Sequence, residues 1–250
     1  MTFSVFMTYY ISMENILANV WLHLPNTIKI TYTLKNAIPH DITLLVVFYT
    51  ACRLNADIMF LLDVSGSVRE ENFKTVKEFL KDMVDRLNVG EDESNVGMIS
   101  FSDNAHMEFT MAAYDTRDEI KSSIDNIPYR RGTTNTAEAL RMLREEAMLP
   151  ASGNRTPMRD IAVIFTDGGS NNMKNTIEEA KKAREAGITI LVVAVSEWVQ
   201  KNEIKEIASD PDKMNILAIE NYSAIKDIGD TLESYLCDRK YLFLEVNPTI

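Results

Sequence analysis

From Leu54 onward, apolar and polar residues alternate with two distinct periods. Uninterrupted apolar runs, such as residues 56–62 and 161–165, are typical of strands buried on both faces of a sheet. Between these runs, apolar residues recur every three or four positions, as along 70–87, which is the spacing of one face of a helix. This alternation predicts a mostly parallel sheet covered by helices on both faces.

The order of these segments predicts an α/β fold with a doubly wound, Rossmann-like sheet. About six strands are expected, at 56–62, 95–101, 106–110, 161–165, 188–195 and 216–219. Helices are expected at 70–87, 117–124, 136–147, 175–186, 204–208 and 225–236. We expect 106–110 to be an antiparallel strand at the edge of the sheet. We also expect Gly187 to end the helix at 175–186, because a left-handed residue is favoured after the last turn of a helix.

The first fifty residues differ in composition, since they contain no glycine and few charged residues. The apolar run at 42–51 is too short to span a bilayer, which takes about 20 residues. Three interpretations of residues 1–51 stay open: a misplaced or internally started secretion signal, a strand-rich extension, and a leader that does not belong to the domain. The tail at 238–250 is left as a separate segment, and truncation of a longer chain would explain it.

Charge narrows the classes of partner. The chain has 37 acidic and 26 basic residues, for a net charge of −11. Nucleic acids and anionic membranes bind surfaces with clustered Lys and Arg. We therefore expect no nucleic-acid partner and no membrane insertion of the domain.

The loop after the first strand offers oxygen ligands for a metal ion. It reads Asp63-Val64-Ser65-Gly66-Ser67, so Asp63, Ser65 and Ser67 can point to one side, and Gly66 would allow a tight turn. Ligands gather at the carboxyl ends of strands in sheets of this type. One carboxylate and two hydroxyls suit Mg²⁺ or Mn²⁺ better than zinc. Taken alone, however, Asp and Ser here are equally typical of turns and helix caps.

Two further loops supply matching groups, at 132–136 (Gly-Thr-Thr-Asn-Thr) and at 165–170 (Phe-Thr-Asp-Gly-Gly-Ser). Together, the three loops resemble the metal-ion-dependent adhesion site of von Willebrand factor A domains, and the resemblance covers residues 54–237. It implies that the metal ligands are Asp63, Ser65, Ser67, Thr134 and Asp167, with Thr133 and Thr136 as nearby alternatives. Arg131 stands where the family usually has a second glycine, which would place a charge at the rim of the site.

Cys52 and Cys237, the only cysteines, bracket the expected domain at 52–237. They could close it with a disulfide if its ends lie together, or be two unrelated thiols. The pair resembles that of the extracellular branch of the family, which includes matrilins and non-fibrillar collagens. Glycosylation patterns at Asn154 and Asn221 agree with secretion to the extracellular matrix. Trp198 is either an exposed aromatic anchor beside the metal or a partly packed side chain.

The resemblance implies an adhesion module that binds collagen or another matrix or cell-surface protein. An acidic residue of the ligand would complete the coordination of the metal, and the helix at 225–236 would either move with that change or simply pack. The alternative function is a matrix-assembly module in which the metal site is incidental. An enzyme is not expected, because His23, His40 and His106 accompany no plausible nucleophile and no glycine-rich phosphate loop is present.

Overall fold

The computed structural model describes residues 55–90, 92–195 and 201–236, together with the backbone of five strands at 6–7, 16–22, 27–34, 42–49 and 243–248. The chain divides into two compact units. Leu54–Leu236 form the larger one, and Met1–Arg53 with Cys237–Ile250 form the smaller. Each is described by itself.

The larger unit contains a six-stranded sheet in the order β10-β9-β8-β5-β6-β7. Its strands are β5 (Ala56–Asp63), β6 (Asn95–Phe101), β7 (Ala105–Phe109), β8 (Arg159–Thr166), β9 (Thr189–Val195) and β10 (Ile216–Ile219). Every pairing is parallel except that of β6 with β7, which is antiparallel. The predicted fold class is therefore confirmed, including the antiparallel edge strand. That strand is antiparallel because only three residues separate it from β6, too few for a crossover helix.

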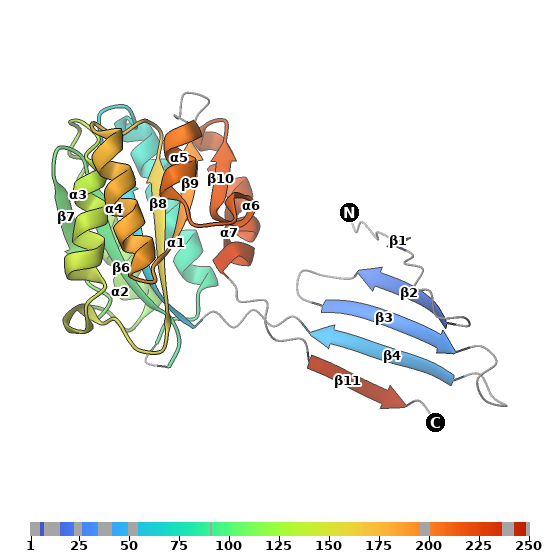
Figure 1. Ribbon diagram of the computed structural model, residues 1–250. Helices are drawn as coiled ribbons and strands as arrows, with labels where there is room; N and C mark the ends of the chain where they lie inside the picture. The colour runs from blue at the N-terminus through green and yellow to red at the C-terminus, as the bar shows by residue number, and fades with distance from the viewer. Residues whose placement is uncertain are drawn as a thin grey trace. The chain divides into compact units, whose positions relative to one another are not determined.

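Two groups of helices cover the sheet (Figure 1). The α-helices are α1 (Glu70–Arg86), α2 (Arg117–Asp125), α3 (Thr136–Met142), α4 (Met173–Glu185), α5 (Lys201–Ile207), α6 (Asp212–Asn215) and α7 (Gly229–Leu236). Helix α1 packs against α2 and α7, whereas α4 packs against α3 and α5. One core cluster joins Leu140 and Ala180 of α3 and α4 to Ile164 of β8. No helix among the described residues is long and apolar enough to cross a membrane.

Two predicted helices change type along their length. Helix 136–147 becomes a π-helical turn, η1 (Leu143–Ala147), after α3. The last helix begins earlier than the predicted 225, as a 3-10 segment, η3 (Tyr222–Ile228), before α7. It starts there because Asn221 Oδ1 accepts hydrogen bonds from the backbone N–H groups of Ser223 and Ala224. The short helices α6 and η2 (Pro150–Ser152) were not predicted.

The smaller unit is a five-stranded antiparallel sheet in the order β1-β2-β3-β4-β11. Its strands are β1 (Phe6–Met7), β2 (Ile16–Leu22), β3 (Thr27–Leu34), β4 (Ile42–Tyr49) and β11 (Phe243–Pro248). Strands β4 and β11 pair with Tyr49 opposite Phe243, so the segments that precede and follow the larger unit are neighbours in this sheet. The domain boundaries at 52 and 237 stay a prediction.

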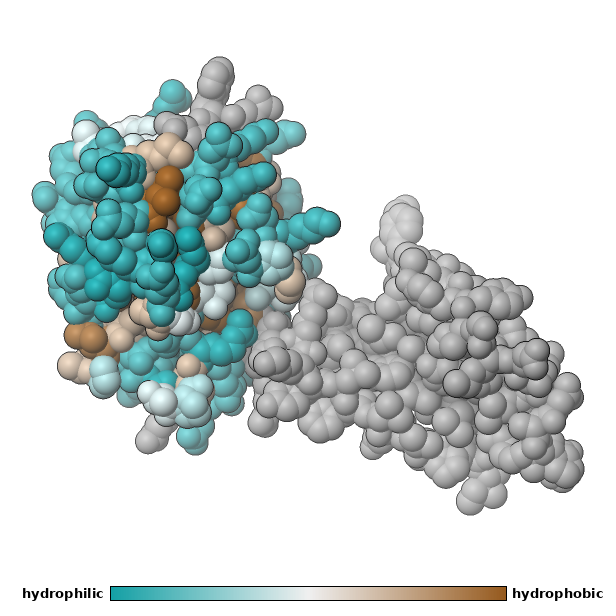
Figure 2. Space-filling model, in the orientation of Figure 1, coloured by the Kyte–Doolittle hydropathy of each residue, from teal (hydrophilic) through white to brown (hydrophobic). Residues whose placement is uncertain are grey.

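The visible face of the larger unit is mostly hydrophilic, with small separate apolar spots (Figure 2). Among the described residues, the large apolar side chains that are exposed are Leu149 and Met214, at 42% and 46%. Scattered exposed apolar residues of this kind are normal on a soluble surface. No large apolar patch therefore marks a binding site on the described surface, and the polar groups at the strand ends are the better candidates.

Candidate metal site

The first and third predicted loops meet because their strands are neighbours. Strand β5 ends at Asp63, and β8 ends at Thr166, directly before Asp167. The two strands are parallel, with Leu62 opposite Phe165. Carboxyl ends of adjacent parallel strands lie at the same edge of the sheet, so the two aspartates come from adjoining positions.

Hydrogen bonds join the polar groups of these two loops into one cluster. The Ser67 hydroxyl donates to Asp167 Oδ1 at 2.7 Å, and the Ser65 and Ser67 hydroxyl oxygens are 3.0 Å apart. Asp63 accepts from the Ser65 backbone N–H at 2.9 Å and from the Thr166 hydroxyl at 2.8 Å. Four of the five residues predicted as metal ligands are thus brought together.

The second loop is tied to both of the others. The Gly66 N–H donates to the Gly132 carbonyl at 3.0 Å, which joins the first and second loops. Thr134 and Asn171 exchange two hydrogen bonds of 2.9 Å, from Thr134 N–H to Asn171 Oδ1 and from Asn171 N–H to the Thr134 carbonyl. The three loops therefore form a closed set of contacts, and Thr134, the fifth predicted ligand, is held within it.

The two alternative threonines are engaged differently. The Thr133 hydroxyl donates to Asp103 Oδ1 at 2.6 Å and accepts from Asn171 Nδ2 at 2.8 Å. The hydrogen bonds that the Thr133 hydroxyl and backbone N–H donate to Asp103 lower the pKa of this exposed carboxyl. Thr136 is buried in the first turn of α3. Because Thr133 is occupied in this way, the geometry favours Thr134 as the second-loop ligand.

Gly66 lies in a turn after β5, as expected, without a positive φ. A Cβ added there would lie 3.4 Å from the Gly132 carbonyl oxygen, so glycine also lets the first and second loops approach closely. Gly132 does require glycine, since its φ is 91° and an added Cβ would lie 2.6 Å from Asp103 Oδ2. Arg131 has a φ of 61°, a conformation that glycine adopts more readily than arginine.

The electrostatics of the cluster favour a cation. Asp63 is only 1% exposed, and burial raises the pKa of its carboxyl to about 6. Burial also raises the pKa of Asp167, which is hydrogen-bonded by the Tyr222 hydroxyl as well as by Ser67. The described partners of Asp63 are hydroxyl and amide donors, so a bound cation would offset the cost of its buried charge.

The donor chemistry fits a hard divalent ion. The cluster contains two carboxylates and several hydroxyls, which suits Mg²⁺ or Mn²⁺. Within the described ranges, no group of three or more His, Cys, Asp or Glu side chains could hold a metal ion. The site therefore relies on hydroxyl oxygens for the rest of its ligands.

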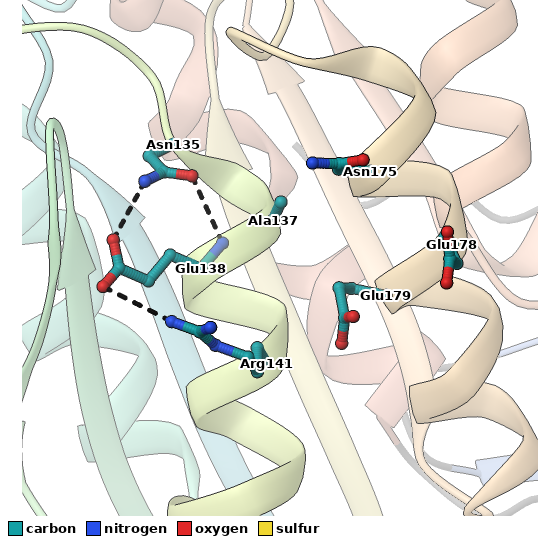
Figure 3. A pocket seen from close by; sticks show the side chains of 7 residues that line it. All are labelled: Asn135, Ala137, Glu138, Arg141, Asn175, Glu178 and Glu179. Atoms are coloured by element: carbon teal, nitrogen blue, oxygen red, sulfur yellow. Dashed lines mark hydrogen bonds and ion pairs between the residues drawn. The ribbon is translucent and has the colours of Figure 1, made fainter.

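A separate polar groove of about 400 Å³ lies between α3 and α4 (Figure 3). Its lining residues are Asn135, Ala137, Glu138, Arg141, Asn175, Glu178 and Glu179. Asn135 is the only one that belongs to the metal loops, and its side chain caps α3 by accepting from the Glu138 N–H. The groove is a charged surface between two helices and not part of the candidate metal site.

The remaining predicted residues are placed as follows. Arg131 is exposed at the rim, with its guanidinium carbon 5.8 Å from the centre of the Tyr129 ring. Asn221 is exposed at the start of η3, whereas Asn154 donates its side-chain N–H to Asp160 Oδ1 at 2.6 Å. Cys52, Cys237 and Trp198 lie outside the described residues, and the predictions made for them stay predictions.

Sequence reasoning missed four residues that support the cluster: Asp103, Tyr129, Asn171 and Tyr222. Asp103 follows the end of β6, and Asn171 closely follows the third loop, so their positions at strand ends could have identified them. Tyr129 donates its hydroxyl to the Ser65 carbonyl at 3.1 Å, from 64 residues away. Nothing in the local sequence around the two tyrosines signals these contacts.

Comparison with known proteins agrees with this geometry. The von Willebrand factor type A domain family matches residues 57–231. Matrilin-1 of Homo sapiens is 34% identical over 181 residues, which are 72% of this chain and 36% of matrilin-1. The collagen alpha-1(XII) chain of Notophthalmus viridescens is 30% identical over 186 residues, which are 74% of this chain and 20% of the collagen chain. The matched part of this chain thus spans about a third of the length of matrilin-1 and about a fifth of the length of the collagen chain.

Solved structures give the same result. Proximal thread matrix protein 1 from the mussel byssus has a TM-score of 0.70 at 27% identity, over 74% of this chain and 49% of that chain, and one of its structures has a zinc-occupied MIDAS motif. A manganese-loaded TRAP protein of Plasmodium vivax has a TM-score of 0.61 at 18% identity, over 81% of this chain and 80% of that one. The second likeness supports the fold alone.

Proposed function

Because this chain belongs to the von Willebrand factor type A domain family, we propose that it is an extracellular adhesion module that binds an acidic protein ligand through a divalent metal ion. One observation carries the proposal: hydrogen bonds link three loops into a closed set that gathers two carboxylates and three hydroxyl-bearing residues. A site of that composition would hold a divalent ion without neutralising it fully.

The residues proposed to hold the metal are Asp63, Ser65, Ser67, Thr134 and Asp167, with Mg²⁺ or Mn²⁺ as the ion. When bound, the ion would supply net positive charge and a coordination position open to a ligand carboxylate. The surrounding contacts orient these groups: Thr166 holds the Asp63 carboxylate, and Asn171 holds the backbone of the second loop. Such supporting hydrogen bonds fix the ligand geometry and raise metal affinity.

The proposed partner class is collagen or another protein of the extracellular matrix or cell surface. Its support is the similarity to matrilin-1 and to a collagen chain, together with the mussel thread matrix protein, whose MIDAS motif holds zinc in one structure. Similarity to matrix proteins also supports a binding role over catalysis. His106, the histidine within the described residues, lies on the edge strand β7 and not in the site.

Binding to collagen and fibronectin coated on a sensor surface tests the function. With saturating Mg²⁺ we expect binding to at least one of them, and removal of the metal with EDTA should weaken it by roughly 100-fold or more, since the ligand carboxylate loses its charged partner. Re-addition of Mg²⁺ is the control and should restore binding. Binding that is unchanged in EDTA would contradict the adhesion site and favour matrix assembly through another surface.

The proposed disulfide between Cys52 and Cys237 is supported in each unit separately. In the larger unit, Arg159 lies opposite Ala56 in the sheet and donates to the Leu236 carbonyl at 3.1 Å. The start of β5 and the end of α7 therefore both lie near Arg159. In the smaller unit, the β4–β11 pairing brings the two flanking segments together. Joined ends of this kind are what a bridge requires.

We expect non-reducing mass spectrometry of the protein secreted from cells to find the two cysteines in one cross-linked peptide pair. Reduction should lower the free energy of unfolding by about 2–4 kcal/mol, because the unfolded chain regains its freedom. A variant with Cys52→Ser and Cys237→Ser serves as the control and should not respond to reductant. Two free thiols in the secreted protein would contradict the bridge and remove its support for an extracellular location.

A further inference from the structure

Two arginines at the metal loops have a backbone conformation that favours glycine. Arg69 has φ 64° and ψ 150°, and Arg131 has φ 61°. In the described part of the chain, these are the residues other than glycine with positive φ. Positive φ is energetically unfavourable for arginine but not for glycine, and residues in such conformations concentrate at functional sites. This unfavourable backbone conformation suggests that the two side chains have a role at the site.

Both arginines belong to loops that hold the proposed metal ligands. Arg69 follows Ser67 by two residues, and its charge acts on the Asp167 carboxyl. Arg131 precedes Gly132, whose carbonyl accepts the Gly66 N–H of the first loop. Both side chains are exposed to solvent. They therefore stand at the rim of the site, where a bound ligand would pass.

Aromatic contacts hold the Arg131 side chain in place. Its guanidinium lies over the Tyr129 ring, and that ring stacks on Phe73 of α1 with 5.4 Å between centroids. The Tyr129 hydroxyl also donates to the Ser65 carbonyl of the first loop. A cation on an aromatic face is partly ordered before a ligand arrives, which lowers the entropy lost on binding. Arg131 is thus pre-positioned next to the metal loops.

Neither arginine forms an ion pair with a carboxylate of the described residues. Other arginines of the described residues do form ion pairs with carboxylates, namely Arg86, Arg130, Arg144 and Arg155. The chain as a whole carries a net charge of −11. Two exposed cations at the binding face that form no ion pair with a described carboxylate create a local field that attracts anionic groups.

We propose that Arg69 and Arg131 form an arginine rim that binds acidic side chains next to the carboxylate coordinated at the metal. The ligand is then a protein segment with several clustered Asp or Glu residues, in place of one isolated acid. Guanidinium groups suit this role because they donate paired hydrogen bonds to carboxylates. This inference rests on the proposed function and names the ligand class of the same site.

NMR titration of the whole chain with two synthetic peptides tests the arginine rim. Both are capped pentapeptides, one with a single central glutamate between glycines and one with three successive glutamates. In saturating Mg²⁺ we expect the three-glutamate peptide to bind more tightly, by on the order of 2- to 5-fold for each arginine. Arg69→Gly and Arg131→Gly should each remove its share of this preference, measured as the ratio of the affinities for the two peptides at saturating Mg²⁺.

The glycine variants also separate binding from folding. Since glycine accepts positive φ without strain, each should unfold at the same or a higher temperature than the wild type while binding the three-glutamate peptide less well. Arg131→Lys keeps the charge and should retain part of the preference. Glycine variants that keep the full preference would overturn the arginine rim.

Two further outcomes are distinguishable. If the one-glutamate peptide fails to bind in Mg²⁺, the metal-dependent function is contradicted, and the rim is still judged by the difference between the wild type and the glycine variants with the three-glutamate peptide. If heparin binds in an arginine-dependent manner and the three-glutamate peptide does not, the ligand is a sulfated polysaccharide and the proposed acidic protein segment is wrong.

Discussion

Replacing Asp63 with asparagine should abolish metal binding and at the same time make the metal-free protein more stable. Asp63 is buried at the end of β5, and burial raises the pKa of its carboxyl to about 6, so its charge at neutral pH destabilises the metal-free fold. Asparagine keeps the shape and can still accept from the Ser65 N–H. We expect the free energy of unfolding without metal to rise by about 1–3 kcal/mol.

The affinity for Mg²⁺, measured by titration calorimetry, should fall by roughly 100-fold or more, because a neutral amide oxygen replaces one of two carboxylates. Asp160→Asn is a matched control. Asp160 is also partly buried, with a pKa raised by burial, but it lies at the opposite end of β8 from the metal loops. The control should bind Mg²⁺ normally. If Asp63→Asn retained Mg²⁺ affinity within tenfold of the wild type, the proposed ligand set would be wrong.

Replacing Arg155 with methionine should destabilise the fold more than any surface substitution. Asp57, at the start of β5, is fully buried, and its carboxylate accepts three hydrogen bonds from Arg155: from the backbone N–H at 2.5 Å, from Nε at 2.9 Å and from Nη2 at 2.6 Å. Arg155 Nη2 also donates to the Glu93 carbonyl at 2.7 Å. Without the guanidinium, a buried carboxylate loses its counter-charge, at a cost of about 3–5 kcal/mol.

Chemical denaturation measures this cost. Arg141→Met is the control, because Arg141 is 55% exposed and its 3.8 Å ion pair with Glu138 should contribute less than about 0.5 kcal/mol. Adding Asp57→Asn to Arg155→Met should recover part of the loss, since the unpaired charge is removed. A double variant no more stable than Arg155→Met would contradict the buried ion pair as the cause. The Mg²⁺ affinity of the folded variants should not change, because Asp57 and Asp63 lie at opposite ends of β5.

The sequence predicted local elements but not the contacts between segments that are distant along the chain. The run Asp63-Val64-Ser65-Gly66-Ser67 is continuous, so its oxygens were expected to lie near one another, although the loop alone was equally typical of a turn or a helix cap. In the structure these oxygens cluster with Asp167 because β5 and β8 are adjacent parallel strands. The support from Asn171 and Tyr129 was not predictable in this way. These residues are polar or aromatic in loops, where periodicity says nothing about which neighbour they meet.

Helix ends show the same division. Periodicity predicted one apolar face for the last helix, and Leu232 and Leu236 of that face are buried as expected. It could not specify a 3-10 start at Tyr222, because that start depends on the Asn221 cap. Local hydrogen bonds and packing decide the geometry of a helix terminus more than average propensity does.

By itself, the sequence determined the order of the predicted strands and helices and the doubly wound fold, because both depend on local periodicity. The proposed ligand set came from the resemblance of three strand-end loops to the von Willebrand factor A family. Only the tertiary structure shows that the Thr133 hydroxyl is held by Asp103, and this contact supports Thr134 as the proposed second-loop ligand. The tertiary structure also decided the buried pairing of Asp57 with Arg155, across 98 residues, and the strained conformations of Arg69 and Arg131. Contacts of that range arise only once the sheet has brought its loops together, so no pattern along the chain encodes them.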